Sequence, residues 1–416
     1  MTASKKPDAP RTLFLDSPEA ADQFLSSIET TRVVAIDTEG ASFHRYVDRI
    51  YLLQLSTDAR HAILDPLKVS SPSRLGSLLE SREVEVVFHD ADYDLRLLHQ
   101  DYGWQVNNIF DTRIAAQLLG IKAFGLAALL DSYFGVKLDK KHQRADWSMR
   151  PLPSDMLDYA AQDTMHLLGL REQLRDALER KGRWHWAREE FARLEGTQWD
   201  SEDIGSSFLR LKGARDLSRR ELALLRELAI WRDGVAKGID RSTFRVVTND
   251  VLLDLARRSP RTMDDLRGVK GIGRGILEHR GEEMLEAMAR GRAVPDAELP
   301  RFPKSPRWDR DPLFDERVAR LKRVRDESAS QLELDPGVLC ARDRLEAVAR
   351  AKPRHIDEVQ EIQELRGWQI EVLGPSFVHA LKDLSNGEGP NEPAATAAPP
   401  APAENDEADA SPYRDG

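Results

Sequence analysis

The second half of the chain contains a sequence that occurs twice. The segment from Phe244 to Met288 aligns with the segment from Leu332 to Leu381. In each copy a helical pattern, LARRSPRTMDDL in the first and VARAKPRHIDEV in the second, precedes a glycine-containing turn and a closing helix. The repeat therefore restricts this half of the chain to two copies of one small all-α unit.

Strand patterns occur before the repeat and fade after Trp199. Apolar runs at Val33–Thr38, Ile50–Ser56 and His61–Leu64 are separated by short gaps, which favours an antiparallel meander. Strand and helix patterns then alternate, as expected for a mixed sheet covered by helices. The predicted fold class is α/β, followed by all-α domains. An amphipathic helix is predicted over Leu217–Val235, with Gly238 following its end.

We expect more than one domain, because 416 residues exceed what one core usually supports. A proline-rich charged segment suggests a linker, and an acidic Ala/Pro-rich end cannot bury enough apolar surface to fold. The expected division is a flexible N-terminus at 1–10, an α/β domain at 11–205, a helical domain at 206–294, a linker at 295–312, a second and degenerate helical domain at 313–386, and a disordered tail at 387–416.

Four carboxylates and one tyrosine in three short segments suggest metal-dependent chemistry. Asp37 and Glu39 end a predicted strand in VVAIDTEG, and residues two apart on a strand share a face. Tyr159 and Asp163, in LDYAAQDTMHL, are four apart on a predicted helix over 155–174 and also share a face. Asp94, in FHDADYDLRLL, lies in the first turns of a helix that follows the run Val84–Phe88.

If these segments converge, like charges about 4 Å apart repel by about 4 kcal/mol per pair at an effective dielectric constant of 20. Divalent cations remove this conflict. Oxygen ligands without cysteine or histidine at ligand spacing favour Mg²⁺ or Mn²⁺ over zinc. Two such ions can activate a water and stabilise the leaving oxygen during attack on a phosphodiester.

Any one of these acids could instead be an ordinary turn former or helix cap. The conjunction is more specific, because IDTE, HDADYDL and YAAQD occur in the order of the three motifs of the DEDD exonuclease superfamily, and together they resemble the ribonuclease D family. The resemblance also covers QLS at 54–56, ILDPL at 63–67, FDTRIAAQLLG at 110–120 and LDKKHQRADWSMRPL at 138–152. It implies a ribonuclease H-like fold and a 3′ to 5′ exoribonuclease that releases nucleoside 5′-monophosphates.

The resemblance also implies roles for the five residues. Asp37, Glu39, Asp94 and Asp163 would bind two divalent ions, Mg²⁺ or Mn²⁺. Tyr159 would mark the tyrosine subclass, since the histidine subclass carries its histidine five positions before the last aspartate, where this chain has Asp158. Because tyrosine titrates near 10, we expect Tyr159 to orient a metal-bound water rather than to act as a base.

Candidate substrate-binding residues lie beside the motifs. Some family members have an aromatic residue directly after the first-motif glutamate, whereas this chain has Gly40. Phe43, His44 and Tyr46 follow and could stack on or hydrogen-bond a terminal nucleotide, although such aromatic residues are as often packing residues. Further candidates are Thr38, within the first motif, and His89, which could contact the scissile phosphate region or only complete a strand end.

The first copy of the repeat, with the helix before it, resembles the HRDC domain of ribonuclease D and certain helicases, and the second resembles a degenerate copy. In the first, KGIGRG at 270–275 is preceded by no strand, so a dinucleotide-binding loop is disfavoured. Its backbone N–H groups, with Lys270 and Arg274, could hold a phosphate. A turn that only permits helix packing is an equal alternative.

Charge is unevenly distributed along the chain. The net charge is −10, but residues 211–292 hold 18 Lys and Arg against 13 Asp and Glu, whereas residues 387–416 hold 1 against 7. We therefore expect the first helical domain to bind RNA, although an ordinary solvated surface has the same composition.

No apolar stretch approaches 18 residues, and the first ten residues lack the apolar core of a signal peptide. Cys340 is the single cysteine, and we expect it to be an inert buried residue in a helix. A cytoplasmic protein without membrane contact is predicted.

The sequence thus predicts a metal-dependent exoribonuclease acting on single-stranded 3′ ends of structured RNA such as tRNA precursors. A 3′ to 5′ exodeoxyribonuclease of the same superfamily is an alternative, because the motifs specify the phosphodiester and not the sugar. A catalytically inactive RNA-binding protein is a further alternative, and the helical domains could also dock a partner protein.

Overall fold

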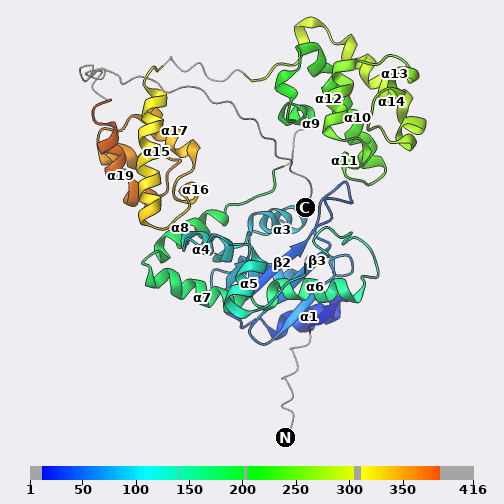
Figure 1. Ribbon diagram of the computed structural model, residues 1–416. Coiled ribbons are helices and arrows are strands. Elements are labelled where there is room, and N and C mark those ends of the chain that lie inside the picture. The colour runs from blue at the N-terminus through cyan, green and yellow to red at the C-terminus, as the bar shows by residue number, and fades with distance from the viewer. Residues whose placement is uncertain (1–11, 140, 201–203, 304–310, 385–416) are drawn as a thin grey trace, which may run out of the picture.

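The computed structural model describes residues 12–139, 141–200, 204–303 and 311–384 (Figure 1). The predicted flexible N-terminus at 1–10 and the predicted acidic tail at 387–416 lie outside these residues, as do residues 304–310 of the predicted linker. No helix in the described part of the chain is both long enough and apolar enough to cross a membrane.

The first half of the chain forms a six-stranded mixed sheet with the strand order β1-β4-β3-β2-β5-β6. The strands are β1 Leu13–Leu15, β2 Val33–Glu39, β3 Leu52–Ser56, β4 His61–Leu64, β5 Glu85–Phe88 and β6 Ile109–Asp111. β2, β3 and β4 pair antiparallel, which confirms the predicted meander, whereas β1, β5 and β6 join parallel. The sequence did not reveal β1 and β6, because three residues are too few to show an alternating pattern.

Helices cover both faces of this sheet. They are α1 Pro18–Ser27, α2 Ser73–Glu80, α3 Asp92–Tyr102, α4 Thr112–Leu118, α5 Leu126–Phe134, α6 Ser154–Met165, α7 Leu167–Arg180 and α8 Trp184–Leu194. Val34 and Ile36 of β2 pack into a core that includes residues of α1, α2 and α3, whereas Ala35 packs into a core that includes residues of α4, α5, α7 and α8. This arrangement confirms the predicted mixed sheet between helices.

The helix predicted over 155–174 is two helices in the structure. The chain leaves the helical path at His166, where φ is −107° and ψ is −1°, between α6 and α7. α6 packs on β2, β3 and β4, whereas α7 packs on α4, α5, α8, β5 and also β2. The apolar periodicity continues through the break, so the sequence pattern could not show that the two halves pack against largely different partners.

The second half is helical and repeats itself. The first repeat contains α10 Arg219–Gly238, α11 Thr243–Val246, α12 Asn249–Arg258, α13 Met263–Arg267 and α14 Arg274–Ala293; the second contains α15 Phe314–Gln331, α16 Pro336–Leu339, α17 Arg342–Ala351, α18 Ile356–Gln360 and α19 Gly367–Leu381. α11 to α13 and α16 to α18 are separated by a constant 93 residues (243 to 336, 267 to 360). Left-handed backbone repeats at the same spacing, at Asp240 and Glu333 and at Ser259 and Lys352. Before the first repeat lie α9 Ile204–Ser207 and two 3-10 turns.

Two local predictions in this half were wrong. α10 begins at Arg219, after a capping box between Ser218 and Glu221, and Gly238 is its last residue rather than the residue beyond its end. Cys340 is buried as expected but is not in a helix. It has extended backbone after α16, because this one-turn helix must end before α17 can begin in a new direction.

Each repeat meets the sheet-containing region along one seam, and the repeats stand apart from each other (Figure 1). The first seam joins residues 42–46 to residues 233–245 of the first repeat. The second seam joins residues 117–124 and 181–190 to residues 332–338 and 366–371 of the second repeat. The apolar core of the second repeat is continuous with that of the sheet-containing region, whereas the first repeat has a core of its own.

Candidate active site

Asp37 and Glu39 lie at the end of β2, the strand that precedes the antiparallel β3. Val34 to Ile36 are fully buried and anchor the strand in the sheet. Asp37 pairs with Gln54 of β3, and Glu39 pairs with Leu52. The strand alternation places both carboxylates on one face, as the sequence predicted.

Asp94 lies in the first turn of α3 and is tied directly to β2. Its carboxylate accepts hydrogen bonds from the Thr38 backbone N–H, at 3.0 Å, and from the Thr38 hydroxyl. The turn into α3 passes through Asp90, whose φ is +70°, and Asp111 accepts a 2.8 Å hydrogen bond from the Ala91 N–H. These bonds hold the start of α3 against the ends of β2 and β6.

The third segment enters from α6, which packs on β2, β3 and β4. A 2.7 Å hydrogen bond between the hydroxyls of Thr164 and Ser56 fixes the position of the helix on β3. Carboxylate oxygens of Asp37, Glu39 and Asp163 come to within 4.8 Å of one another, a separation that one metal ion can span. Asp94 is not in this group of three but interacts electrostatically with its members.

Burial and mutual repulsion make the four carboxylates unusually hard to ionise. Burial raises the pKa of Asp37 and of Glu39 well above the usual range, and neighbouring carboxylates raise both further. Burial, then the charge of Asp94, raises the pKa of Asp163 to about 7. Within the part of the chain that the structure describes, the charges acting on these groups come from other carboxylates and not from lysine or arginine. Such a cluster fits hard divalent cations, which favour the ionised form.

Tyr159 lies beside this cluster, on the face of α6 that also carries Asp163. Burial and the charge of Asp163 raise the pKa of the Tyr159 hydroxyl, so it stays protonated at neutral pH. Its ring lies 5.7 Å from the ring of His142 and 6.0 Å from that of Trp147. Trp147 is fully buried, so this side of the tyrosine is closed by the chain between α5 and α6.

The segment that carries His142 and Trp147 is held by a partly buried ion pair. The Arg150 guanidinium donates two 2.7 Å hydrogen bonds to the two oxygens of Asp65 and further bonds to the carbonyls of Trp147 and Tyr51. A bidentate pair of this kind fixes geometry as well as charge. Arg150 and Asp65 thus position the segment that packs against Tyr159.

The absence of a side chain at position 40 is explained by Tyr93 of the second motif. A Cβ at Gly40 would collide with the Tyr93 hydroxyl and would lie 2.8 Å from an Asp48 oxygen. Tyr93 donates a hydrogen bond to Asp48, and its ring remains partly exposed. The space that a side chain at position 40 would need is therefore filled by a tyrosine adjacent to Asp94.

His89 is held as a neutral imidazole. Burial lowers its pKa to about 4, and its Nδ1 lies 2.9 Å from the Thr112 hydroxyl. The Thr112 hydroxyl itself donates to the Phe88 carbonyl, so we assign the His89 proton to Nδ1. Nε2 of His89 can then accept a hydrogen bond but cannot offer a positive charge to a phosphate.

The other predicted substrate-binding residues divide into two groups. Phe43, His44 and Tyr46 lie at the first seam, and the Tyr46 hydroxyl donates to both oxygens of Asp233, at 2.9 and 2.8 Å. Lys270 and Arg274 lie at the turn between α13 and α14, which Figure 1 places on the side of the first repeat away from β2. Arg274 forms an exposed 2.7 Å ion pair with Glu278. Contact of these five residues with RNA stays a prediction.

No role was predicted for four residues that shape the site: Asp65, Tyr93, Asp111 and Arg150. Asp111 had a local signal, because an aspartate directly before a helical run is a preferred N-cap, and its side chain accepts from the Arg113 and Ile114 N–H groups. The Arg150–Asp65 pair joins positions 85 residues apart and had no local signal.

Comparison with known proteins agrees with this geometry. The 3′-5′ exonuclease family matches residues 14–179, and the HRDC domain family matches residues 221–288 and 314–381. Ribonuclease D of Granulibacter bethesdensis is 31% identical over 392 residues, which cover 93% of this chain and 96% of that protein.

Two crystal structures share the overall fold. A protein from Bifidobacterium adolescentis has a TM-score of 0.77 at 25% identity, covering 90% of this chain and 100% of that chain. Escherichia coli RNase D, an exoribonuclease involved in structured RNA processing, has a TM-score of 0.70 at 23% identity, covering 90% and 99%. With the acidic cluster in the exonuclease-matching region and two HRDC matches behind it, this chain belongs to the ribonuclease D family.

Proposed function

We propose that this 3′ to 5′ exoribonuclease of RNA processing hydrolyses the terminal phosphodiester of RNA by a two-metal-ion mechanism and releases nucleoside 5′-monophosphates. The observation that carries the proposal is the convergence of Asp37, Glu39 and Asp163 in a buried site that lacks a neutralising cation among the described residues. The proposed ions are Mg²⁺ or Mn²⁺, because all the ligands are hard oxygen donors.

Asp37, Glu39, Asp94 and Asp163 are the proposed ligands. When bound, the ions would acidify the attacking water and neutralise charge on the leaving oxygen. Thr38 holds Asp94 in place through two hydrogen bonds and thereby positions a ligand. Tyr159 keeps its proton and can donate a hydrogen bond to the attacking water or to the scissile phosphate.

The proposed substrate is the single-stranded 3′ end of a structured RNA such as a tRNA precursor. Neutral His89 can accept a hydrogen bond from a ribose hydroxyl in the region of the scissile phosphate. Phe43 and His44 would contact the next nucleotides along the strand, counted from its 3′ end. Lys270 and Arg274 would hold phosphates farther along the RNA, at the turn before α14.

We further propose the domain division expected from the sequence, with an exonuclease domain at 11–205 and HRDC domains at 206–294 and 313–386. Separate buried cores in the exonuclease region and in the first repeat support the boundary near 206. A cytoplasmic location stays a prediction.

The test is stepwise digestion of a 5′-labelled single-stranded RNA in Mg²⁺. Asp37→Ala and Asp163→Asn should each lower the rate by on the order of 10³ or more, because a metal-ligand loss removes several kcal/mol of transition-state stabilisation. Asp158→Asn, at an exposed position on the same helix, is the matched control and should retain full activity.

Full activity of the Asp37 or Asp163 variant would contradict the proposed site. A DNA oligomer of the same sequence, run in parallel, tests the sugar preference. Equal or faster digestion of the DNA would replace the exoribonuclease assignment with the exodeoxyribonuclease alternative.

A further inference from the structure

The first seam contains an open polar cavity between two domains. Its volume is about 330 Å³. It is lined by His44, Arg45 and Asp146 of the exonuclease region and by Ile239, Asp240, Arg241 and Arg245 of the first repeat. Asp146 lies 3.8 Å from His44, and Asp240 pairs with Arg45. Arg241 and Arg245 are exposed, and neither forms an ion pair with a carboxylate of the described residues. The seam therefore presents cations to solvent although the chain as a whole is acidic.

Two exposed phenylalanine rings meet at the first seam, and each directly precedes a residue that lines the cavity. Phe43 and Phe244 are each 44% exposed, and their ring centroids lie 5.9 Å apart at an interplanar angle of 76°. The Arg144 guanidinium lies 5.4 Å from the Phe43 ring centroid. Arg245 donates a hydrogen bond to the Phe43 carbonyl, which fixes the two phenylalanine-bearing segments relative to each other. Exposed rings held in place by arginines are suited to stacking on nucleobases.

This cluster is continuous with the active site. The segment that carries Arg144 also carries His142, whose ring packs against Tyr159. His44 Nε2 lies 3.1 Å from the Arg144 carbonyl and donates to it, which joins the seam to the same segment. An RNA strand that leaves the site past Tyr159 would thus meet Arg144 and Phe43 next, and then the first repeat.

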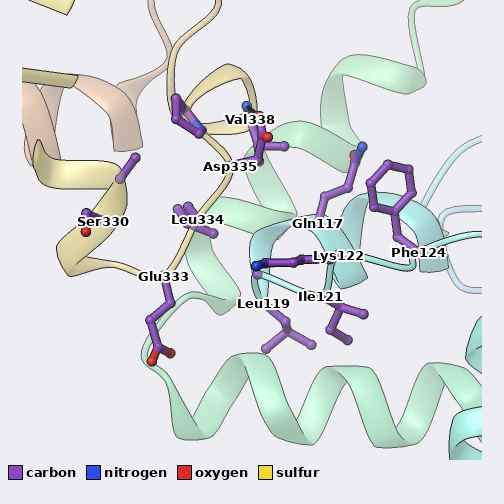
Figure 2. A pocket seen from close by; sticks show the side chains of 13 residues that line it. Gln117, Leu119, Ile121, Lys122, Phe124, Ser330, Glu333, Leu334, Asp335 and Val338 are labelled. Carbon is purple, nitrogen blue, oxygen red and sulfur yellow. Dashed lines mark hydrogen bonds between the residues drawn. The ribbon is translucent and has the colours of Figure 1, made fainter. Parts of the chain in front are cut away.

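The second seam shows that these side chains are not required for docking a repeat. The constant spacing of the two HRDC matches pairs Arg241, Phe244 and Arg245 with Leu334, Gly337 and Val338. In Figure 2, Glu333, Leu334 and Asp335 of the second repeat lie across a cavity of about 760 Å³ from Gln117 and Lys122. The same docking loop is basic and aromatic in one repeat, and apolar and acidic in the other.

We propose that the first seam is a binding site for single-stranded RNA just upstream of the 3′-terminal nucleotides, shared by the exonuclease domain and the first HRDC repeat. Phe43 and Phe244 stack on bases, while Arg144, Arg241 and Arg245 pair with phosphates. The site rests on the proposed function, because it extends the path of the strand whose 3′ end is cleaved. Stacking and phosphate contacts predict binding with little base preference.

The test compares two substrate lengths in the full chain. Phe244→Ala should weaken binding of a 5′-fluorescein 12-nucleotide RNA roughly tenfold, measured by fluorescence anisotropy in EDTA, because each stacked base contributes substantially. Cleavage of a trinucleotide in Mg²⁺ should keep its kcat/KM, because so short a strand does not reach the first repeat. Phe244→Leu retains apolar packing without the ring and should show the same loss. Phe14→Ala, at a partly exposed phenylalanine on β1, is the matched control.

Arg241→Ala tests the proposed phosphate contacts independently of base stacking. Loss of one phosphate contact should reduce the slope of log Kobs against log salt by about 0.7, the value for a single strand. Arg258→Ala, at an exposed arginine on α12, should leave the slope unchanged. Unchanged 12-nucleotide affinity in both Phe244 variants, or an equal loss in Phe14→Ala, would overturn the proposal. Failure of the unaltered protein to cleave either RNA would instead contradict the proposed function, and the binding comparison would still decide whether the seam holds RNA.

Discussion

The two HRDC repeats use the same loop to meet the exonuclease domain, but the contacts that the loop makes differ in kind. Asp240 and Glu333 occupy equivalent left-handed positions in that loop, with φ of 46° and 55°. The Asp240 carboxylate accepts hydrogen bonds from Arg45 and from the Tyr46 N–H, at 3.0 and 3.2 Å. The Glu333 carbonyl lies so close to Gly120 that a Cβ there would collide with it. The same position of the loop therefore makes a polar contact in the first repeat and a close-packed backbone contact in the second.

Among the described residues, a second contact is made by the second repeat and has no equivalent in the first. Trp368, at the start of α19, is 2% exposed and stacks on Trp186 at 4.9 Å, and its indole N–H donates to Glu190 at 2.8 Å. The Glu189 carboxylate accepts from the Gly367 and Trp368 N–H groups at the start of that helix, where a negative charge is favourable. The equivalent residue of the first repeat is Gly275, around which a Cβ would meet nothing within 4 Å. One repeat is thus part of the structural core, while the other keeps side chains available for a ligand.

The largest expected effect on stability comes from removing the Trp368 contact of the second repeat. Trp368→Ala should lower the free energy of unfolding by about 3 to 5 kcal/mol, because it leaves a cavity beside Trp186 in a continuous core. Urea denaturation followed by far-UV circular dichroism measures this loss.

Gly275→Ala tests the equivalent position of the first repeat. An added methyl group there meets open space, so the stability should change by no more than about 0.5 kcal/mol. A loss below about 1 kcal/mol for Trp368→Ala would show that the second repeat is as loosely attached as the first.

Metal binding and pH should also affect the stability of the two repeats differently. The pKa of Asp163 is raised from 3.8 to about 7, so the folded metal-free protein holds this proton more tightly than the unfolded chain does. Its stability should therefore fall as the pH rises from about 4 to about 7. Mg²⁺ at 100 times its Kd should add roughly 2.7 kcal/mol and remove this dependence.

Hydrogen exchange resolved by mass spectrometry measures which regions share this stabilisation. Amides of α17 and α19 should gain protection together with the sheet, because the second repeat shares its core with the exonuclease domain. Amides of α12 and α14 should change little, because the first repeat has a separate core. Equal gains in both repeats would contradict the distinction.

The relative placement of the candidate site residues could be predicted because the information that determines it is local. Two residues on a strand and two on a helix share a face through backbone geometry alone, so Asp37 with Glu39 and Tyr159 with Asp163 could be placed without knowing the fold. The repeat and the meander were predictable for the same reason. The order of the motifs indicated the family, and the resemblance to that family implied that the three segments converge.

What the sequence could not provide depends on packing between distant segments. The break at His166 follows from different partners for α6 and α7, and the fit of Tyr93 over Gly40 joins positions 53 residues apart (40 to 93). Tyr46 showed this limit most clearly. Its contact with a nucleotide stays a prediction, and the sequence did not show that its hydroxyl donates a hydrogen bond to Asp233 of the first repeat. An aromatic residue beside a catalytic motif looks the same in sequence whether it faces a ligand or another domain.

A smaller loss of stability than that of Trp368→Ala is expected from Asp233→Asn at the first seam. Burial and the Asp233 carboxylate raise the pKa of Tyr46 to about 12, so the tyrosine keeps its proton and donates a hydrogen bond to that carboxylate. An amide accepts more weakly, and the loss should be about 1 kcal/mol because the bond is partly exposed and the first repeat keeps its own core. The seam should loosen, and KM for a 12-nucleotide RNA should rise a few-fold with kcat unchanged.

Tyr46→Phe removes the same bond from the other side, so the double variant should lose little more than either single variant. Glu190→Gln is the counterpart at the second seam. It weakens the acceptor for both Trp368 and Arg366, and should lower stability more than Asp233→Asn while leaving KM for the longer RNA unchanged. If Glu190→Gln raised that KM as much as Asp233→Asn, both repeats would act on the substrate path, and the difference between their seams would be one of stability alone.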